Sequence, residues 1–160
     1  MGILAFLGGV TALVIEYPRI DTAFYISHVT GNMTYAPSNF MFLTNRDDTY
    51  APQPESVCFR ISNIAQTIVN QIQIPASNLN VKVSTNVDCQ DCKTNTSIGE
   101  LDAQKDSDVC KNVYITKNTD ELKFNVTSSF DAVILQNTVN SFVCKKIGEP
   151  TTYQNLYHCN

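Results

Sequence analysis

The sequence predicts an all-β protein, a β-sandwich of the immunoglobulin-like or jelly-roll type that is held by disulfides. Short apolar runs separated by turn residues recur along the chain at spacings of about ten residues, which is typical of sandwiches and barrels. The six cysteines are an even number, which indicates up to three disulfides and an oxidising compartment. Charged residues make up only 16% of the chain, and Asn, Thr and Ser take their place, as is common outside cells.

The first element is an apolar arm over residues 1–17, and we expect a single β-sandwich domain over residues 18–160. At 160 residues the chain can bury a core of its own. No residue from Gly2 to Ile15 is charged. Its β-branched residues and its central pair of glycines disfavour a helix. We therefore predict an extended strand, clearest over residues 11–17 and ended by Pro18.

Further strands are predicted wherever apolar and polar residues alternate or a short apolar run lies between turn residues. They cover residues 22–30, 40–43, 57–61, 80–84, 113–115, 122–126, 132–135 and 141–144. Residues 61–74 fit both an amphipathic helix and a strand, and their composition favours a strand. Residues 88–111 are polar and contain three of the cysteines, so we expect a long loop there.

All six cysteines are disulfide candidates, namely Cys58, Cys89, Cys92, Cys110, Cys144 and Cys159. A bond between Cys144 and Cys159 would fix the C-terminal tail. Either Cys89 or Cys92 could close the long loop by pairing with Cys110. The Cys89–Cys92 spacing also occurs in zinc and redox sites, but no second such pair and no helix-forming sequence follows it.

Three N-X-S/T sequons begin at Asn32, Asn95 and Asn125 and are candidate glycosylation sites. Chance alone gives a similar number of sequons in a chain so rich in Asn, Ser and Thr. Their placement is the better argument. Asn32 lies in a predicted turn, Asn95 in the polar loop, and Asn125 on the polar side of an alternating strand, so we expect all three to be exposed.

Charge and motifs exclude several classes of function. The net charge is −4 and the Lys and Arg residues do not cluster, so we expect no nucleic-acid partner. The sequence contains no nucleophile elbow, P-loop or HExxH motif, so we predict no enzyme activity and no cofactor. Asp102, Asp106 and Asp108 resemble a calcium loop only in charge, and without the ligand pattern we expect a solvated acidic loop and no metal site.

The apolar arm has several possible roles. It lacks the positive charge of a signal peptide and is shorter than a membrane span, so neither cleavage nor anchoring is favoured. It could be the first strand of its own sandwich. It could also pair with an exposed sheet edge of a neighbouring subunit, and such head-to-tail contacts produce open filaments. We favour this exchange, although both roles require the same apolar, β-favouring residues.

The layout of residues 2–17, followed by a β-rich domain, resembles subunits of donor-strand filaments. These are the chaperone–usher pilins of bacteria and the thread-type or bundling filaments of archaea. The resemblance implies a non-enzymatic extracellular or cell-surface subunit whose partner is itself, in a filament or surface layer used for adhesion. The donor residues would be Ile3, Leu4, Phe6, Leu7, Val10, Leu13, Val14 and Ile15.

The alternative is a surface-displayed or secreted recognition domain of viral or adhesin type. Such a domain would bind a protein or a glycan at the cell surface through loops such as residues 86–112. Removal of residues 1–17 distinguishes the two functions. An assembly subunit would lose polymerisation, whereas a recognition domain would stay monomeric or fail to fold.

Overall fold

A computed structural model describes residues 2–5, 12–26, 40–45, 54–67, 71–151 and 154–159. Apart from one short 3₁₀ turn, η1 (Asp91–Lys93), the regular elements among these residues are strands, as predicted. The strands are β1 (Gly2–Ala5), β2 (Ala12–Glu16), β3 (Ile20–Ile26), β4 (Phe40–Asn45), β5 (Glu55–Asn63), β6 (Gln71–Gln73), β7 (Ala76–Thr85), β8 (Thr96–Leu101), β9 (Asp106–Val113), β10 (Glu121–Ala132), β11 (Ile134–Thr151) and β12 (Gln154–Cys159).

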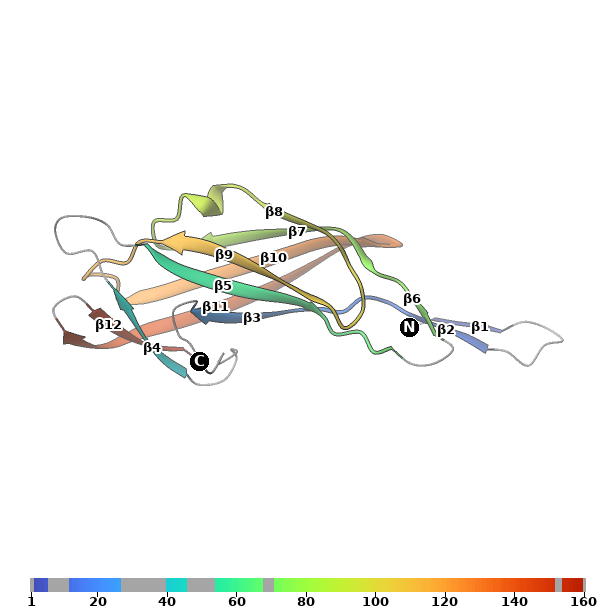
Figure 1. Cartoon of the computed structure of the whole chain (residues 1–160), viewed down its shortest axis with the longest axis horizontal. Helices are drawn as coiled ribbons and strands as arrows, with labels where there is room; N and C mark the ends of the chain where they lie inside the picture. The colour runs from blue at the N-terminus through green and yellow to red at the C-terminus, as the bar shows by residue number, and fades with distance from the viewer. Residues whose placement is uncertain are drawn as a thin grey trace.

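Two sheets form the body of the molecule. One is six-stranded in the order β4-β12-β11-β10-β7-β8, and the other is three-stranded in the order β3-β5-β9. Figure 1 shows the smaller sheet lying in front of the larger one, as two layers. A third sheet, β1-β2-β6, lies at one end. The predicted disulfide-held β-sandwich is therefore confirmed, while its assignment to the immunoglobulin-like or jelly-roll type stays a prediction.

Four phenylalanines join the two layers. Phe24 and Phe59 come from the three-stranded sheet, and Phe124 and Phe142 come from the six-stranded sheet. Their ring centroids lie between 5.4 Å (Phe24–Phe124) and 5.9 Å (Phe59–Phe142) apart. Such tilted and edge-on aromatic contacts contribute about 1 kcal/mol each beyond the burial of their area. This cluster is the centre of the core.

Strand β11 changes its neighbour along its length. Residues Ile134–Lys145 pair with β10, whereas β12 pairs only with Cys144 and the residues after it. The two pairings overlap at Cys144 and Lys145, and Cys144 lies directly opposite Cys159 and is bonded to it. Among the described strands, none pairs with Ile134–Val143 on the side away from β10. This segment is therefore an edge of the sheet.

All six cysteines are paired, as Cys58–Cys110, Cys89–Cys92 and Cys144–Cys159. The Cys144–Cys159 bond fixes the C-terminal strand, as expected. The expectation that Cys89 or Cys92 bonds to Cys110 is wrong. Cys110 lies directly opposite Cys58 in the β5–β9 pair and bonds to it. Cys89 and Cys92 therefore bond to each other.

The prediction of a loop over residues 88–111 is also wrong, because it contains β8 and most of β9. The inward positions of β9 include Lys111, which hides the alternation of apolar residues. The Lys111 side chain is buried, and its ammonium donates to the carbonyl oxygens of Asp91 and Thr94 at 3.0 and 3.3 Å and to the Thr96 hydroxyl at 3.1 Å.

The predicted strand over residues 132–135 is interrupted by a turn, because Ala132 ends β10 and Ile134 and Leu135 begin β11. Residue Val133 connects β10 to β11 with a φ of 72°. That left-handed conformation favours Gly or Asn, and a β-branched residue there is strained. Of the ambiguous stretch 61–74, only its two ends lie in strands, β5 and β6, among the described residues.

We expect the Cys144→Ser/Cys159→Ser variant to lose about 3 kcal/mol of unfolding free energy, because that bond closes a loop of 15 residues in the unfolded chain. Chemical denaturation under oxidising conditions measures the loss. The matched control is Cys89→Ser/Cys92→Ser, whose bond spans a separation of only 3 residues. An equal loss in the two variants would contradict the loop-closure account.

Candidate functional site

The arm folds as a hairpin and not as one continuous strand. β1 pairs with β2 in antiparallel register, from Gly2↔Ile15 to Ala5↔Ala12. On its other side β2 pairs in parallel with β6. Figure 1 shows the β1–β2 pair extending beyond the end of both layers of the sandwich. The predicted strand over residues 11–17 thus corresponds to β2, which is one half of a projecting hairpin.

The candidate donor residues divide between the two strands of this hairpin. Ile3 and Leu4 lie on β1, and Leu13, Val14 and Ile15 lie on β2. Phe6, Leu7 and Val10 lie outside the described residues. Within the three-stranded sheet β1-β2-β6, β1 is an edge strand.

The side chain of Asn63 fastens the base of the arm to the body. Its Oδ1 accepts hydrogen bonds from the backbone N–H of Arg19 at 3.1 Å and of Ala65 at 3.2 Å. Its Nδ2 donates to the Leu101 carbonyl oxygen at 3.1 Å. Asn63 is only 1% exposed, so water does not reach these backbone groups. Its amide supplies their hydrogen bonds and joins three segments of the chain that are distant from one another in sequence.

Backbone hydrogen bonds reinforce this junction. The N–H of Ile64 donates to the Arg19 carbonyl at 2.8 Å, and the N–H of Ile74 donates to the Glu16 carbonyl at 3.0 Å. The N–H of Gln104 donates to the Asn63 carbonyl at 2.8 Å. These hydrogen bonds hold the residues at the base of the arm against the body.

The edge of β11 is the second feature of this end of the molecule. Exposed apolar residues lie along this edge: Ile134 and Leu135 are each 67% exposed, and Val139 is 62% exposed. The turn residue Val133, at 80%, extends this surface. Figure 1 shows the β10–β11 turn at the same end of the sandwich as the β1–β2 hairpin.

The acidic residues of the stretch 88–111 do not gather into a metal site. The Asp108 carboxylate accepts from the Arg60 guanidinium at 2.8 and 3.2 Å, while Asp102 and Asp106 are exposed. The Arg60 guanidinium also lies 5.7 Å from the centre of the Tyr25 ring. Within the described ranges, no three His, Cys, Asp or Glu side chains are grouped as metal ligands.

Charge and burial shift two pKa values in this cluster. The hydrogen bonds from Arg60 lower the pKa of the Asp108 carboxyl below its usual value. Burial raises the pKa of the Tyr25 hydroxyl, and the nearby Asp108 charge raises it further. The cluster therefore links β3, β5 and β9 electrostatically on the outside of the sheet, which is a structural role.

Two of the three sequons lie in described parts of the chain, and Asn32 falls outside them. Asn95 is exposed, just after η1. Asn125 is exposed on β10, and its Oδ1 accepts a hydrogen bond from the Ser141 hydroxyl at 2.6 Å. Both asparagines are thus accessible to a glycan.

One open pocket, of about 550 Å³, lies away from the arm. Its lining includes Asn86, Asp88, Tyr114 and Asp120. Part of its polar surface already has structural partners. The Asn86 amide donates to the Glu121 carbonyl and accepts from the Lys123 N–H, each at 2.8 Å.

The chain matches no protein-family model, and comparisons with curated proteins and with solved structures gave no match. In the segments that the structure describes, no helix has the length and apolar character to cross a membrane. The function proposed below therefore rests on where the residues lie in this structure.

We expect Asn63→Ala to lower the unfolding free energy by about 3 kcal/mol, because it leaves several buried backbone groups without a hydrogen-bond partner. Urea denaturation measures this loss. Asn80→Ala is the matched control, since its exposed amide makes a hydrogen bond only to the nearby Asn78 carbonyl. Similar losses for the two variants would show that Asn63 does not hold the junction.

The Arg60–Asp108 pair predicts a pH dependence of stability. The folded-state pKa of Asp108 is lowered, so the pair stabilises the protein above the unfolded pKa of about 3.9 and the stabilisation is lost as the pH falls through the folded pKa. The Asp108 side chain is 38% exposed, so we expect less than about 1 kcal/mol.

Between about pH 5 and about pH 2, the wild-type protein should therefore lose slightly more unfolding free energy than Asp108→Asn. Denaturant titrations of both proteins at a series of pH values test this. Parallel curves for the two proteins would refute the contribution of the pair.

Proposed function

We propose that this protein is a non-enzymatic extracellular structural subunit that assembles head-to-tail through its N-terminal arm. The observation that carries the proposal is the β1–β2 hairpin, which extends beyond the sandwich on a fixed base. The products of assembly would be a filament or a surface layer used in adhesion. The donor residues are those on β1 and β2, together with Phe6, Leu7 and Val10.

The physical reason is the cost of an apolar sheet edge in water. The edge strand β1 directs backbone N–H and C=O groups away from β2, and its segment from Gly2 to Ala5 has no charged or Pro residue to discourage another strand. Proteins usually protect such edges. Pairing with a neighbouring subunit would satisfy these groups and bury the apolar residues. If the acceptor lies elsewhere on the neighbour, the contact repeats without closing.

An extracellular setting supports this role. The three disulfides are compatible with a secreted or extracellular protein, because such bonds persist in oxidising compartments. Exposed Asn95 and Asn125 would accept glycans there. Glycans on the body would leave the arm free to assemble.

The second candidate function is recognition of a protein or a glycan. The observation that favours it is the pocket with Tyr114 beside Asn86 and Asp88, because an aromatic ring with amide and carboxylate groups can bind a polar ligand. The structural hydrogen bonds of Asn86 reduce what the pocket can offer, so we place assembly first.

The test is the particle mass of the intact chain by light scattering, with negative-stain images of the same samples. We expect the wild type to form species of many times 17.8 kDa. The Ile3→Lys/Leu4→Lys variant should be monomeric. Adjacent residues of a strand face opposite ways, so one of the two charges meets any apolar groove that the arm enters.

The matched control is Asn80→Lys/Ser84→Lys, which adds the same charge at exposed positions on β7 and should assemble like the wild type. Circular dichroism checks that both variants are folded. A wild type that stays monomeric, or an arm variant that assembles normally, would contradict the proposed function. The first result would favour the recognition domain.

A further inference from the structure

We propose that the edge of β11, Ile134–Val143, is the acceptor for the N-terminal arm of a second copy of this chain. The inference rests on the proposed function and names the partner surface within it. It starts from the stagger of β11, whose first part pairs with β10 on one side and has no partner among the described strands on the other. On that side, about every second residue offers its N–H and C=O groups to a further strand.

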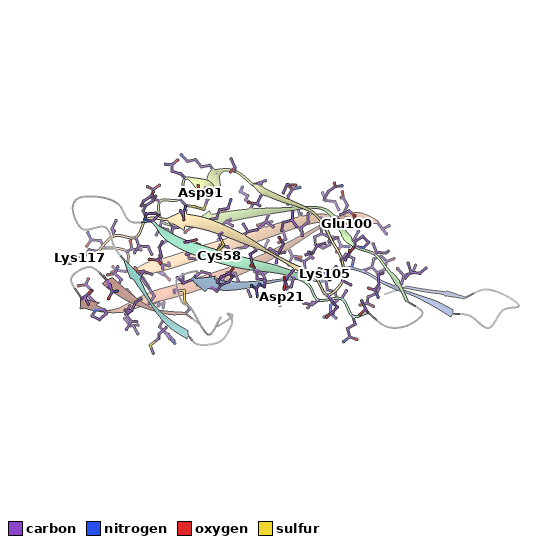
Figure 2. All side chains as sticks on the ribbon, viewed as in Figure 1. Asp21, Cys58, Asp91, Glu100, Lys105 and Lys117 are labelled. Atoms are coloured by element: carbon purple, nitrogen blue, oxygen red, sulfur yellow. A yellow bond between two sulfur atoms is a disulfide. The ribbon has the colours of Figure 1, made fainter. Side chains whose placement is uncertain are left out.

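The sequence of this edge contains none of the charged residues or prolines that usually block strand addition. Of the four strands at the ends of the two body sheets, three do carry them. β3 contains Asp21 and β8 contains Glu100, both labelled in Figure 2, and β9 contains Asp106 and Lys111. β8 also pairs irregularly with β7. From Ile134 to Val143 there is no charged residue and no proline. Natural proteins rarely leave a long edge in this state unless a partner covers it.

The strand β4 is also an uncharged edge, but it is only 6 residues long. The β11 edge is longer, at roughly 30 Å for a strand of this length. We therefore assign the acceptor to β11 and treat β4 as the competing site that the experiment must separate.

The side chains of this edge are arranged unusually for a strand of a sandwich. Leu135 and Val139, on the outer face, are 67% and 62% exposed, whereas Thr138 and Asn140 point the other way and are partly buried. The Asn140 amide donates to the Thr22 hydroxyl of β3 at 3.2 Å, so the Asn140 side chain lies against the other layer. The outer-face side chains of an added strand would lie beside Leu135 and Val139 and bury part of their apolar surface, which would contribute about 25 cal/mol per Å² buried.

The turn before this edge adds to the same surface. Val133, Ile134 and Leu135 are consecutive and exposed. A turn residue such as Gly or Asn would relieve the positive φ of Val133 and would also be more soluble. The sequence thus keeps a strained apolar turn at the end of the molecule from which the edge begins.

The arm of a second copy suits this edge in chemistry. Neither the run from Gly2 to Ile15 nor the edge from Ile134 to Val143 would bury a charge on pairing, and β1 is itself an edge strand that can pair with a further strand. The arm of the same chain is already held as a hairpin that extends away from the sandwich, with β2 between β1 and β6. A second copy is therefore the occupant that we propose.

The experiment mixes two variants of the full chain. The arm variant is Ile3→Lys/Leu4→Lys, which keeps an intact edge. The edge variant is Leu135→Lys/Val139→Lys, which keeps an intact arm and changes only exposed side chains. We expect each variant alone to be monomeric and the mixture to form a complex of about two chains, since only one productive contact exists between them. The Asn80→Lys/Ser84→Lys variant, which should assemble normally, is the control.

The possible failures point to different conclusions. If the edge variant assembles alone like the wild type, the arm binds elsewhere, for example at β4. The acceptor assignment is then wrong, while the proposed function stands. If both variants are monomeric but do not combine, arm and edge do not meet, and the assignment also fails. If the wild type itself is monomeric, the proposed function fails.

Discussion

The partner change of β11 is the constraint on which the rest of the structure depends. The first part of β11 extends the β7–β10 part of the large sheet, and its last part pairs with β12. The exchange occurs at Cys144, where the bond to Cys159 holds the two strands in register. Two residues earlier, Phe142 enters the aromatic cluster that joins the layers. The same stagger that closes the core at one end leaves a long uncharged edge at the other.

This edge and the N-terminal hairpin are complementary features of one end of the molecule. The base of the hairpin is held by Asn63, and the hairpin itself extends beyond the body. Both segments lack charge, and within the described strands both contain a sheet edge that is not paired with a further strand. A molecule that kept them exposed would aggregate, whereas one that pairs them between copies would assemble in an ordered way. The assembly proposal accounts for both features with one contact.

Sequence reasoning found the strands whose apolar residues face inward. The alternation of Phe24 and Ile26 in β3 and of Val81 and Val83 in β7 is of this kind, and all four side chains are buried. It missed β9, where Lys111 takes an inward place, and the turn at Val133, where an apolar residue occupies a position that favours Gly. The open edge of β11 lies beyond local patterns altogether, because it depends on where β12 stops along β11. That register is a long-range property of the fold.

The most direct test of this account is amide hydrogen exchange in the assembled wild type and in the monomeric Ile3→Lys/Leu4→Lys variant. The account predicts slower exchange in the assembly for about half of the amides from Ile134 to Val143, because every second residue of that edge gains a partner. Exchange in β8, the edge strand at the far side of the same sheet, should be unchanged. Equal exchange of the β11 amides in the two samples, or protection that appears in β4 instead, would contradict it.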